Sequence, residues 1–528
     1  MAVMSSPGGN NLSNLEDDNT NIITENSDSI NSFDNNLYSS GDSIGITCNA
    51  AENKGFNSVT TVDLDDNDKE VSENESSWSK LPSLAVENIY TFLSRTDQSR
   101  MSLVCSRWSK DFNSPRLWKT MKFYLPEHDY SSEIYPEVRF ARKYAYMFRH
   151  VEIICKRVRT HLTGVIWRQL KLFLKAMLSS SQLSSVKFIN MGNYFRHLDD
   201  ILREDLFKIV VRFFNSQENL KTVIFQDSHF SKDEGLELLK AMFHSDKNTI
   251  RNLTLQGFVS EAPSMELSNQ YLSNLSEVCC KISNVESLDV DYIQIFEDVI
   301  NCLYEKFSSG DCQLDKNEPN ISTLCIYCED KRLSGLKGIL PGTWKYLTNV
   351  FPDMKVKMDV TIHNHLYDEM EKFLVKEIPL QTLNFRFEKS PANIRTDISA
   401  LFTYLQMCKY QDYLEVLNVL WMPSIDDFAE SVIPFVKSCK KLQTFHIHAQ
   451  YTPREIENVL KGFLENPPAS LKSITLWFNY LDEGADEDNI RALSEEYYLL
   501  FNTQGIECFL IVDPSRRLRR RERNVIVP

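Results

Sequence analysis

Two His-x-His pairs are the residues of this sequence whose spacing best suits metal chemistry. His363 and His365 stand two positions apart, and so do His446 and His448. Because successive side chains of a strand point to opposite faces, each pair would place both imidazoles on one side of a strand. Two imidazoles are only half of a zinc site, and few other ligand residues lie nearby. We therefore interpret the four histidines as solvated or hydrogen-bonded residues and expect no bound metal or cofactor.

The other motifs argue against an enzyme. The sequence has no Gly-x-x-x-x-Gly-Lys-Ser/Thr phosphate loop, no Gly-x-Ser-x-Gly nucleophile elbow and no His-Glu-x-x-His zinc motif. Its twelve cysteines form no visible framework, and its one Cys-x-x-Cys, Cys325 to Cys328, lacks a second pair at zinc spacing. We interpret the cysteines as free thiols, mostly buried, in a reducing compartment. The sequence thus indicates no catalytic residues.

Charge and composition set off both ends of the chain. Residues 1–76 are rich in Asn, Ser, Asp and Thr and carry fifteen acidic residues against two Lys. Such a segment buries too little apolar surface to offset its chain entropy, so we expect a disordered acidic tail. Residues 514–528 carry six Arg against one Glu and form a basic tail. This tail is a nuclear-import signal, a contact for an acidic surface or a solvated end.

The remaining composition excludes other classes of partner. The body between the tails is mildly acidic, so no specific nucleic-acid binding is expected. No run approaches eighteen apolar residues, so we expect no membrane span. The first ten residues have neither a basic nor an apolar segment of the secretory kind. We expect the protein in the cytoplasm, the nucleus or both.

Three short helices are predicted directly after the acidic tail, within residues 77–125. Pro82 suits the first turn of one helix, where a missing N–H costs little, and Asp97 suits the N-cap of the next. Their apolar faces would carry Ile89, Phe92, Leu93, Met101, Val104, Cys105, Trp108, Leu117 and Trp118. A core this small does not stand comfortably alone. The segment is either an ordinary helical subdomain or a module that completes its core with a partner.

The types and spacing of these residues resemble the F-box, over roughly forty residues and a dozen positions. The resemblance implies that the segment binds the Skp adaptor. By the same resemblance, the adaptor-facing or core positions are Leu81, Pro82, Ile89, Phe92, Leu93, Val104, Cys105, Trp108, Leu117 and Trp118. Two residues depart from the family's pattern: Leu84 stands where an acidic residue is frequent, and Gln98 stands where a leucine is frequent. These departures would weaken adaptor contacts without removing the apolar face.

A strand pattern, apolar-x-x-apolar-x-apolar, recurs twelve times after residue 125. It runs from Phe148 to Ile506, 358 residues over eleven steps, or about 32–33 residues per unit. Helical patterns fill the intervals, and two of them open with capping boxes, at Ser231 to Glu234 and at Thr452 to Glu455. Such units bury their apolar faces only against their neighbours. The even spacing favours a solenoid over a single α/β domain with right-handed crossovers.

We therefore predict an α/β protein in four parts. A disordered N-terminal tail (1–76) precedes a short three-helix F-box (77–125), a leucine-rich-repeat-like α/β solenoid or horseshoe (126–513), and a basic tail (514–528). The repeats are degenerate, because the Asn or Cys after the last leucine of a strict repeat is mostly missing. The combination of F-box and repeats is similar to the F-box only protein 39 type.

A target-binding surface is predicted on the concave side of this solenoid, where the strands would form a parallel sheet. Side chains between the last two apolar positions of a unit, and just after them, would point outward. Aromatic and Arg residues are frequent interface anchors. The candidates are Asn384, Arg386, Trp421, His446, His448, Thr475 and Trp477.

The resemblance implies a substrate-recognition subunit of an SCF (Skp–cullin–F-box) ubiquitin ligase. The Skp adaptor would join it to the cullin and RING subunits, while the repeats hold an unknown target protein. Its contribution would be proximity, with no bond chemistry of its own. The alternative is a non-catalytic repeat scaffold whose F-box acts outside a ligase. Leu84 and Gln98 are the residues that favour this alternative.

Overall fold

All residues that the structure describes belong to one of the two units into which the chain divides, Ile46–Pro528. The computed structural model describes residues 77–125, 135–156, 162–178, 181–244, 249–260, 269–311, 320–329, 337–363, 366–388, 397–425, 427–451, 456–480 and 487–514. The predicted acidic tail and all but the first residue of the predicted basic tail lie outside these ranges.

Short helices open the described chain. They are η1 (Ser77–Lys80), α1 (Ser83–Phe92), α2 (Arg95–Ser102), α3 (Ser106–Phe112) and α4 (Pro115–Trp118). The predicted N-cap Asp97 lies inside α2, and the N-cap is Ser94, whose hydroxyl accepts the backbone N–H of Asp97. Met101 and Trp108, predicted on one helix face, belong to separate helices, because Cys105 is the N-cap of α3.

A sheet of parallel strands follows, in which neighbours in the chain are neighbours in the sheet. The strands are β1 (Thr120–Leu125), β2 (His150–Cys155), β3 (Ser185–Ile189), β4 (Thr222–Gln226), β5 (Asn252–Gln256), β6 (Ser287–Asp291), β7 (Thr323–Glu329), β8 (Lys355–Ile362), β9 (Leu380–Phe387), β10 (Val416–Ile425), β11 (Thr444–Tyr451), β12 (Ser473–Tyr480) and β13 (Glu507–Pro514). The twelve predicted repeats correspond to β2 to β13. The sequence pattern missed β1, which pairs with β2 from Thr120 and His150 onward, so the sheet begins inside the segment predicted as F-box.

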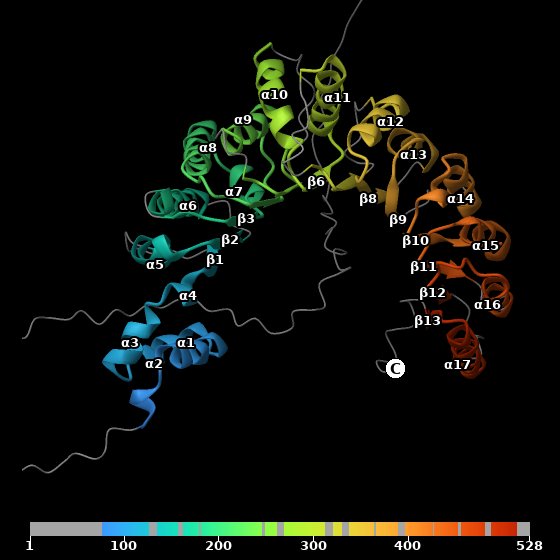
Figure 1. Ribbon diagram of the computed structural model, residues 1–528, viewed down its shortest axis with the longest axis horizontal. Helices are drawn as coiled ribbons and strands as arrows, with labels where there is room; N and C mark the ends of the chain where they lie inside the picture. Colours follow the sequence, from blue (N-terminus) through green and yellow to red (C-terminus); the bar gives the residue numbers. More distant parts are fainter. Residues whose placement is uncertain are drawn as a thin grey trace, which may run out of the picture. The chain divides into compact units, whose positions relative to one another are not determined.

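Helices connect the strands and lie along one face of the sheet (Figure 1). They are α5 (Pro136–Tyr144), η2 (Ala145–Met147), α6 (Thr163–Leu178), α7 (Gly192–Phe195), α8 (Asp200–Asn215), α9 (Lys232–Met242), α10 (Asn269–Ile282), α11 (Gln294–Ser309), α12 (Pro341–Val350), α13 (Leu366–Phe373), α14 (Ile398–Met407), η5 (Tyr410–Asp412), α15 (Phe428–Ser438), α16 (Ile456–Leu464) and α17 (Glu487–Thr503). The opposite face, which we call the open face, is covered by none of these helices.

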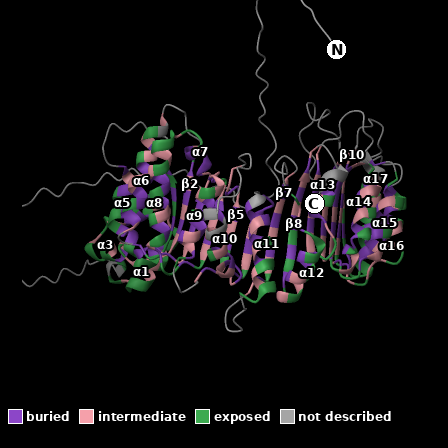
Figure 2. Ribbon diagram, turned by 90° about the horizontal axis from the view of Figure 1, so that it is seen from above, coloured by how far each residue is buried: buried purple, intermediate pink, exposed green. Residues whose placement is uncertain are grey.

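Alternation along each strand builds the core. In β7, Leu324, Ile326 and Cys328 are buried, and the residues between them are half-buried. The buried side of every strand merges with the inner sides of the helices into one continuous apolar core. Figure 2 shows buried, intermediate and exposed residues side by side along the same helices. Each unit thus depends on its neighbours for burial, as a solenoid requires.

Local features of the repeats agree with the sequence patterns in part. The capping box at Ser231 is confirmed, because Ser231 and Glu234 bond each other's backbone N–H at the start of α9. The second predicted box, at Thr452 to Glu455, lies outside the described residues. Nine described cysteines are free thiols. Cys280 departs from the free-thiol prediction, because it is disulfide-bonded.

Candidate protein-binding surfaces

Helix α1 has two apolar sides, and only one of them is buried. Val86 and Tyr90, four positions apart, are completely buried against the neighbouring helices. Leu84 and Phe92 lie on the other side and are exposed, Phe92 by 88%. Phe92 follows Leu84 by eight positions, which on a helix of 3.6 residues per turn is a rotation of only about 80°. The two side chains therefore lie in one apolar stripe along the helix. An apolar stripe left in water is typical of a surface that another chain covers.

The turn between α2 and α3 adds further exposed apolar side chains, Leu103 and Val104. Within residues 77–118, five large apolar side chains are each more than 60% exposed, and we call them the F-box apolar surface: Trp78, Leu84, Phe92, Leu103 and Val104. In the other described residues, comparable exposure occurs singly on scattered elements, at Ile201, Leu340, Met407 and Leu499. Exposed apolar residues are thus concentrated in this short segment.

A polar network around Gln98 holds the inner side of the helices together. Gln98 is buried, and its Nε2 donates to the carbonyl oxygen of Tyr90 at 2.7 Å, near the end of α1. Arg95 donates to Gln98 Oε1 at 2.8 Å. The Tyr90 hydroxyl donates to the carbonyl of Trp108 at 2.9 Å and so joins α1 to α3. Gln98 therefore has an internal role, and the expectation that it weakens adaptor contacts loses its basis.

The ten predicted adaptor-binding residues fall into three classes of exposure. Pro82, Phe92 and Val104 are exposed, whereas Leu81, Ile89, Leu93, Cys105 and Trp108 are half-buried. Leu117 and Trp118 are buried, so of the two positions expected for them, adaptor-facing or core, they occupy the core. The prediction also passed over Trp78, Leu84 and Leu103. A Leu-Val pair in a turn, where polar residues are usual, is the signal that would have pointed to Leu103.

Trp118 is buried because it joins the F-box helices to the first solenoid unit. Its ring stacks on Tyr144 at a centroid distance of 5.2 Å and meets the edge of Phe140 at 5.0 Å, both on α5. On the F-box side it contacts Phe112 at 4.9 Å and lies under the guanidinium of Arg95 at 4.9 Å. These contacts make Trp118 a structural residue between the two parts.

The middle of the open face carries a chain of polar side chains across β8, β9 and β10. Asn384 and Arg386 are half-buried there. Asn418 donates to Asn384 Oδ1 at 2.7 Å, and Asn384 donates in turn to Asp359. Arg386 lies 3.8 Å from a carboxylate oxygen of Glu388. This region presents polar groups that hold one another in place, which suits a polar partner surface.

An aromatic group occupies the open face further along, on β11 and β12. The His448 ring stacks on Trp477 at 4.5 Å, with an angle of 13° between the rings. Asn479 Nδ2 lies 2.8 Å from His448 Nε2. Burial lowers the pKa of both His446 and His448, and for His446 the neighbouring His448 lowers it further. Both histidines therefore favour the neutral form, and the His448 ring is held between Trp477 and Asn479.

Trp421 is the target-binding candidate that the structure contradicts. Its side chain is completely buried and lies 4.9 Å from the ring of Phe387. It stands two positions after Val419, and with a period of two it points into the core together with Leu417 and Val419. Asn418 is the neighbouring residue that reaches the open face instead.

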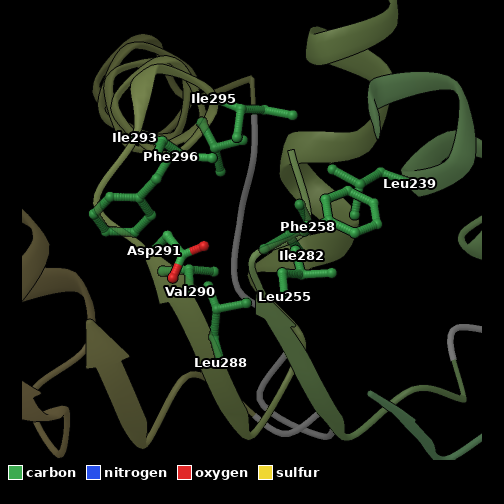
Figure 3. A pocket seen from close by; sticks show the side chains of 11 residues that line it. Leu239, Leu255, Phe258, Ile282, Leu288, Val290, Asp291, Ile293, Ile295 and Phe296 are labelled. Carbon is green, nitrogen blue, oxygen red and sulfur yellow. The ribbon is translucent and has the colours of Figure 1, made fainter. Parts of the chain in front are cut away.

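The cavity between β5 and β6 is too small for a ligand. Apolar side chains from these strands and from α9 to α11 point into it (Figure 3), and its volume is ≈ 30 Å³. Such a space accommodates one or two water molecules. Asp291, its polar residue, already accepts the backbone N–H of Gly257 at 2.5 Å. We assign no small-molecule site to this cavity.

The described residues contain no group of three His, Cys, Asp or Glu placed to hold a metal ion, and no helix long and apolar enough to cross a membrane. His365 lies outside them. Burial and the nearby Asp289 raise the pKa of Cys325 to about 12, and burial also raises the pKa of Cys328. The pKa of Cys302 is lowered, because Cys279 hydrogen-bonds to it.

Comparison with known proteins identifies the helical segment. Residues 78–120 match the F-box domain family, so this protein contains an F-box domain. F-box proteins are generally adaptor subunits of SCF complexes that bind Skp1. Among solved structures, one described as a crystal structure of a TLR13–ssRNA13 complex shares 11% sequence identity, with a TM-score of 0.20. The match covers 76% of this chain and 65% of that chain, so it spans less than two thirds of that protein, and at this TM-score it supports no further assignment.

Proposed function

We propose that this protein is the substrate-recognition subunit of an SCF-type ubiquitin ligase. The observation that carries the proposal is the F-box apolar surface, which stands beside buried helix sides within a matched F-box domain. An adaptor that covers Leu84, Phe92, Leu103 and Val104 would remove a large apolar area from water. The Skp adaptor is the partner that the F-box implies, and the cullin and RING subunits would follow through it.

The open face of the solenoid is the proposed target-binding surface. It combines the polar chain at Asp359, Asn384 and Asn418 with the aromatic group at His448 and Trp477. A target held there would meet the ubiquitin-conjugating enzyme repeatedly, so that the transfer becomes effectively intramolecular. We further propose that the degenerate repeats place the protein near the F-box only protein 39 type, in the cytoplasm, the nucleus or both.

Co-purification of the full chain with the Skp adaptor tests the proposal. The variant is Leu103→Asp combined with Val104→Asp, because both side chains are exposed and their replacement leaves the core intact. The control is Leu340→Asp, at a leucine before α12 whose exposed fraction lies between those of Leu103 and Val104. We expect tight binding by the wild type and the control, and at least about a hundredfold loss in the double variant, as for interface hot spots.

The outcomes separate the two candidate functions. Binding that survives the double variant would show that the F-box apolar surface does not dock the adaptor. No binding by the wild type would favour a repeat scaffold whose F-box acts outside a ligase. That alternative has less support than the sequence suggested, because Gln98 lies inside the helices and does not alter their outer surface.

A further inference from the structure

Positive charge is concentrated in the first units of the solenoid. The whole chain has a net charge of −15, yet residues 119–178 carry twelve Lys or Arg against five Asp or Glu. Two of these five carboxylates belong to the described residues. Glu137 is buried and accepts a hydrogen bond from Gln169 at 3.0 Å. Glu152 lies on the open face of the sheet, 3.3 Å from Lys122. Neither carboxylate therefore reaches the outer side of the helices.

Helices α5 and α6 expose five cations, which we call the basic helix surface: Arg139, Arg142, Lys143, Arg168 and Lys175. The three on α5 stand at i, i+3 and i+4, so they share one side of that helix. The two on α6 are seven positions apart, which is close to two full turns. The two helices pack side by side (Figure 1), and the Tyr135 hydroxyl before α5 donates to the carbonyl of Val165 in α6 at 3.2 Å. The cations of both helices thus form one surface.

None of these five cations has an ion-pair partner among the described residues. On the adjoining helix α8, by contrast, Lys208 lies 2.6 Å from a carboxylate oxygen of Glu204, and Arg203 lies 2.6 Å from one of Glu234. Surfaces of soluble proteins normally intersperse both signs of charge, because like charges repel one another. The basic helix surface therefore lacks the counter-charges that another chain can supply.

We propose that the basic helix surface binds an acidic segment of a protein partner. Three of its five cations are Arg, whose planar guanidinium can bond both oxygens of one carboxylate. Acidic side chains spaced along a segment would meet cations from both helices. Charge complementarity of this kind mainly speeds association and specifies the partner, and it weakens as salt is added.

Other anionic partners fit this surface less well. Cations that bind a membrane surface usually stand beside apolar side chains that enter the lipid, and the described residues of α5 and α6 expose no large apolar side chain. Single-stranded nucleic acids stack their bases on accessible aromatic rings. Trp167 is half-buried, with the ammonium of Lys171 4.7 Å from its ring, and its indole N–H donates to the carbonyl of Leu202 at 2.9 Å. An acidic protein segment is thus the favoured occupant.

The basic helix surface is distinct from both surfaces of the proposed function. The F-box apolar surface lies within residues 77–118, and the target-binding candidates lie on the open face, whereas α5 and α6 lie along the opposite face of the sheet (Figure 1). The inference therefore goes beyond the proposed function and does not depend on it. A failure to bind the Skp adaptor would not affect it.

Fluorescence anisotropy of the full chain with a labelled peptide of about ten glutamates tests the proposal at low ionic strength. We expect binding by the wild type that weakens as salt is added. The variant combines Arg139→Gln, Arg142→Gln and Arg168→Gln, and it should bind at least about tenfold more weakly, because three charge pairs are lost. Its circular dichroism should be unchanged, since all three side chains are exposed and glutamine is a good helix former.

A matched control removes the same charge from other exposed positions. It combines Lys345→Gln, Lys376→Gln and Arg491→Gln, which lie on or next to α12, α13 and α17. We expect its affinity for the peptide to remain within about twofold of the wild type, because charges beyond a Debye length are largely screened. An equal loss in the control would show that net charge, and not the basic helix surface, binds the peptide.

Three further results would overturn the proposal. The first is the absence of peptide binding by the wild type. The second is tighter binding of a DNA duplex of equal charge, which would assign the surface to nucleic acid. The third is carbodiimide crosslinking of Lys143 or Lys175 to carboxylates of residues 1–76 in the free chain, which would assign the surface to the chain's own acidic segment.

Discussion

At the residue scale, position within the two-residue period of a strand decides what each candidate side chain can do. Asn384, Arg386, His446 and Trp477 are half-buried on the open face, and His448 lies there in contact with Trp477. Trp421 has the opposite parity and is completely buried. Residue type predicted an interface anchor in both tryptophans, but only Trp477 lies where a partner can reach it.

Replacement of Trp421 tests this difference in burial. Trp421→Ala should destabilise the protein by about 3–5 kcal/mol, because it leaves a cavity beside Phe387. Trp421→Phe should cost clearly less, since the indole N–H has no hydrogen-bond partner among the described residues. Urea unfolding followed by circular dichroism measures both, with Trp477→Ala as the half-buried control. If Trp477→Ala lowered the free energy of unfolding as much as Trp421→Ala does, the assignment of Trp421 to the core and Trp477 to the surface would be contradicted.

The paired histidines predict a pH dependence. Their folded-state pKa values lie below the ordinary 6.5, so the unfolded chain binds more protons than the folded protein just below that pH. Their contribution to stability is therefore complete above about pH 6.5 and declines as the pH falls through this value. NMR of isotope-labelled histidine, assigned with His446→Gln and His448→Gln, should give midpoints below 6.5. Midpoints at or above 6.5 would show that neither ring is held in a desolvated site.

At the element scale, α1 illustrates how one short helix serves two surfaces. Its inner side, with Val86 and Tyr90, packs inside the F-box helices, while its outer side exposes Leu84 and Phe92. The helix is positioned at its end by the side chain of Gln98, which donates to the carbonyl oxygens of Tyr90 and Leu93. A polar residue at this place thus orients an apolar surface that it does not itself form.

Gln98→Leu tests the internal role of this residue. The substitution restores the residue that is frequent in the family, yet it removes the donor to Tyr90 and the acceptor for Arg95. Leaving such buried groups without partners should cost about 1–3 kcal/mol. Hydrogen exchange of residues 83–118 should therefore accelerate. Gln406→Leu, at an exposed position of α14, is the control and should change little. Unchanged hydrogen exchange in Gln98→Leu would mean that the hydrogen bonds of Gln98 do not stabilise the F-box helices.

At the scale of the whole molecule, each unit of the solenoid packs mainly against its neighbours in the chain. The sheet order follows the chain order throughout the described strands. Stability in such an array is approximately a sum of local terms and nearest-neighbour terms. The F-box helices join this array at its first unit, through the rings around Trp118. A perturbation there should remain local.

Trp118→Ala tests how far the coupling extends. The change removes contacts with Phe112, Phe140 and Tyr144 and should cost about 3–5 kcal/mol at this junction. We expect faster hydrogen exchange in α1 to α5 and unchanged exchange in β8 to β13. Faster exchange along the entire sheet would indicate a single cooperative unit instead of a nearest-neighbour array.

The sequence by itself determined the class of fold and the place of the F-box. Repetition of an apolar pattern about every 32–33 residues predicted the strand–helix units, because strand and helix periods are local properties of the chain. The F-box residues, at fixed spacing over one short segment, were also readable without a structure, and residues 78–120 match that family.

Only the tertiary structure decided which of these side chains are accessible. Leu117, Trp118 and Trp421 have the same residue types as surface anchors, but neighbouring elements cover them. Leu84, Phe92 and Leu103 have the same types as core residues, but no described element packs over them. Gln98 looked like a weakness of the outer surface and proved to be an internal hydrogen-bonding residue. Burial depends on contacts between residues far apart in the chain, and a local pattern does not contain this information.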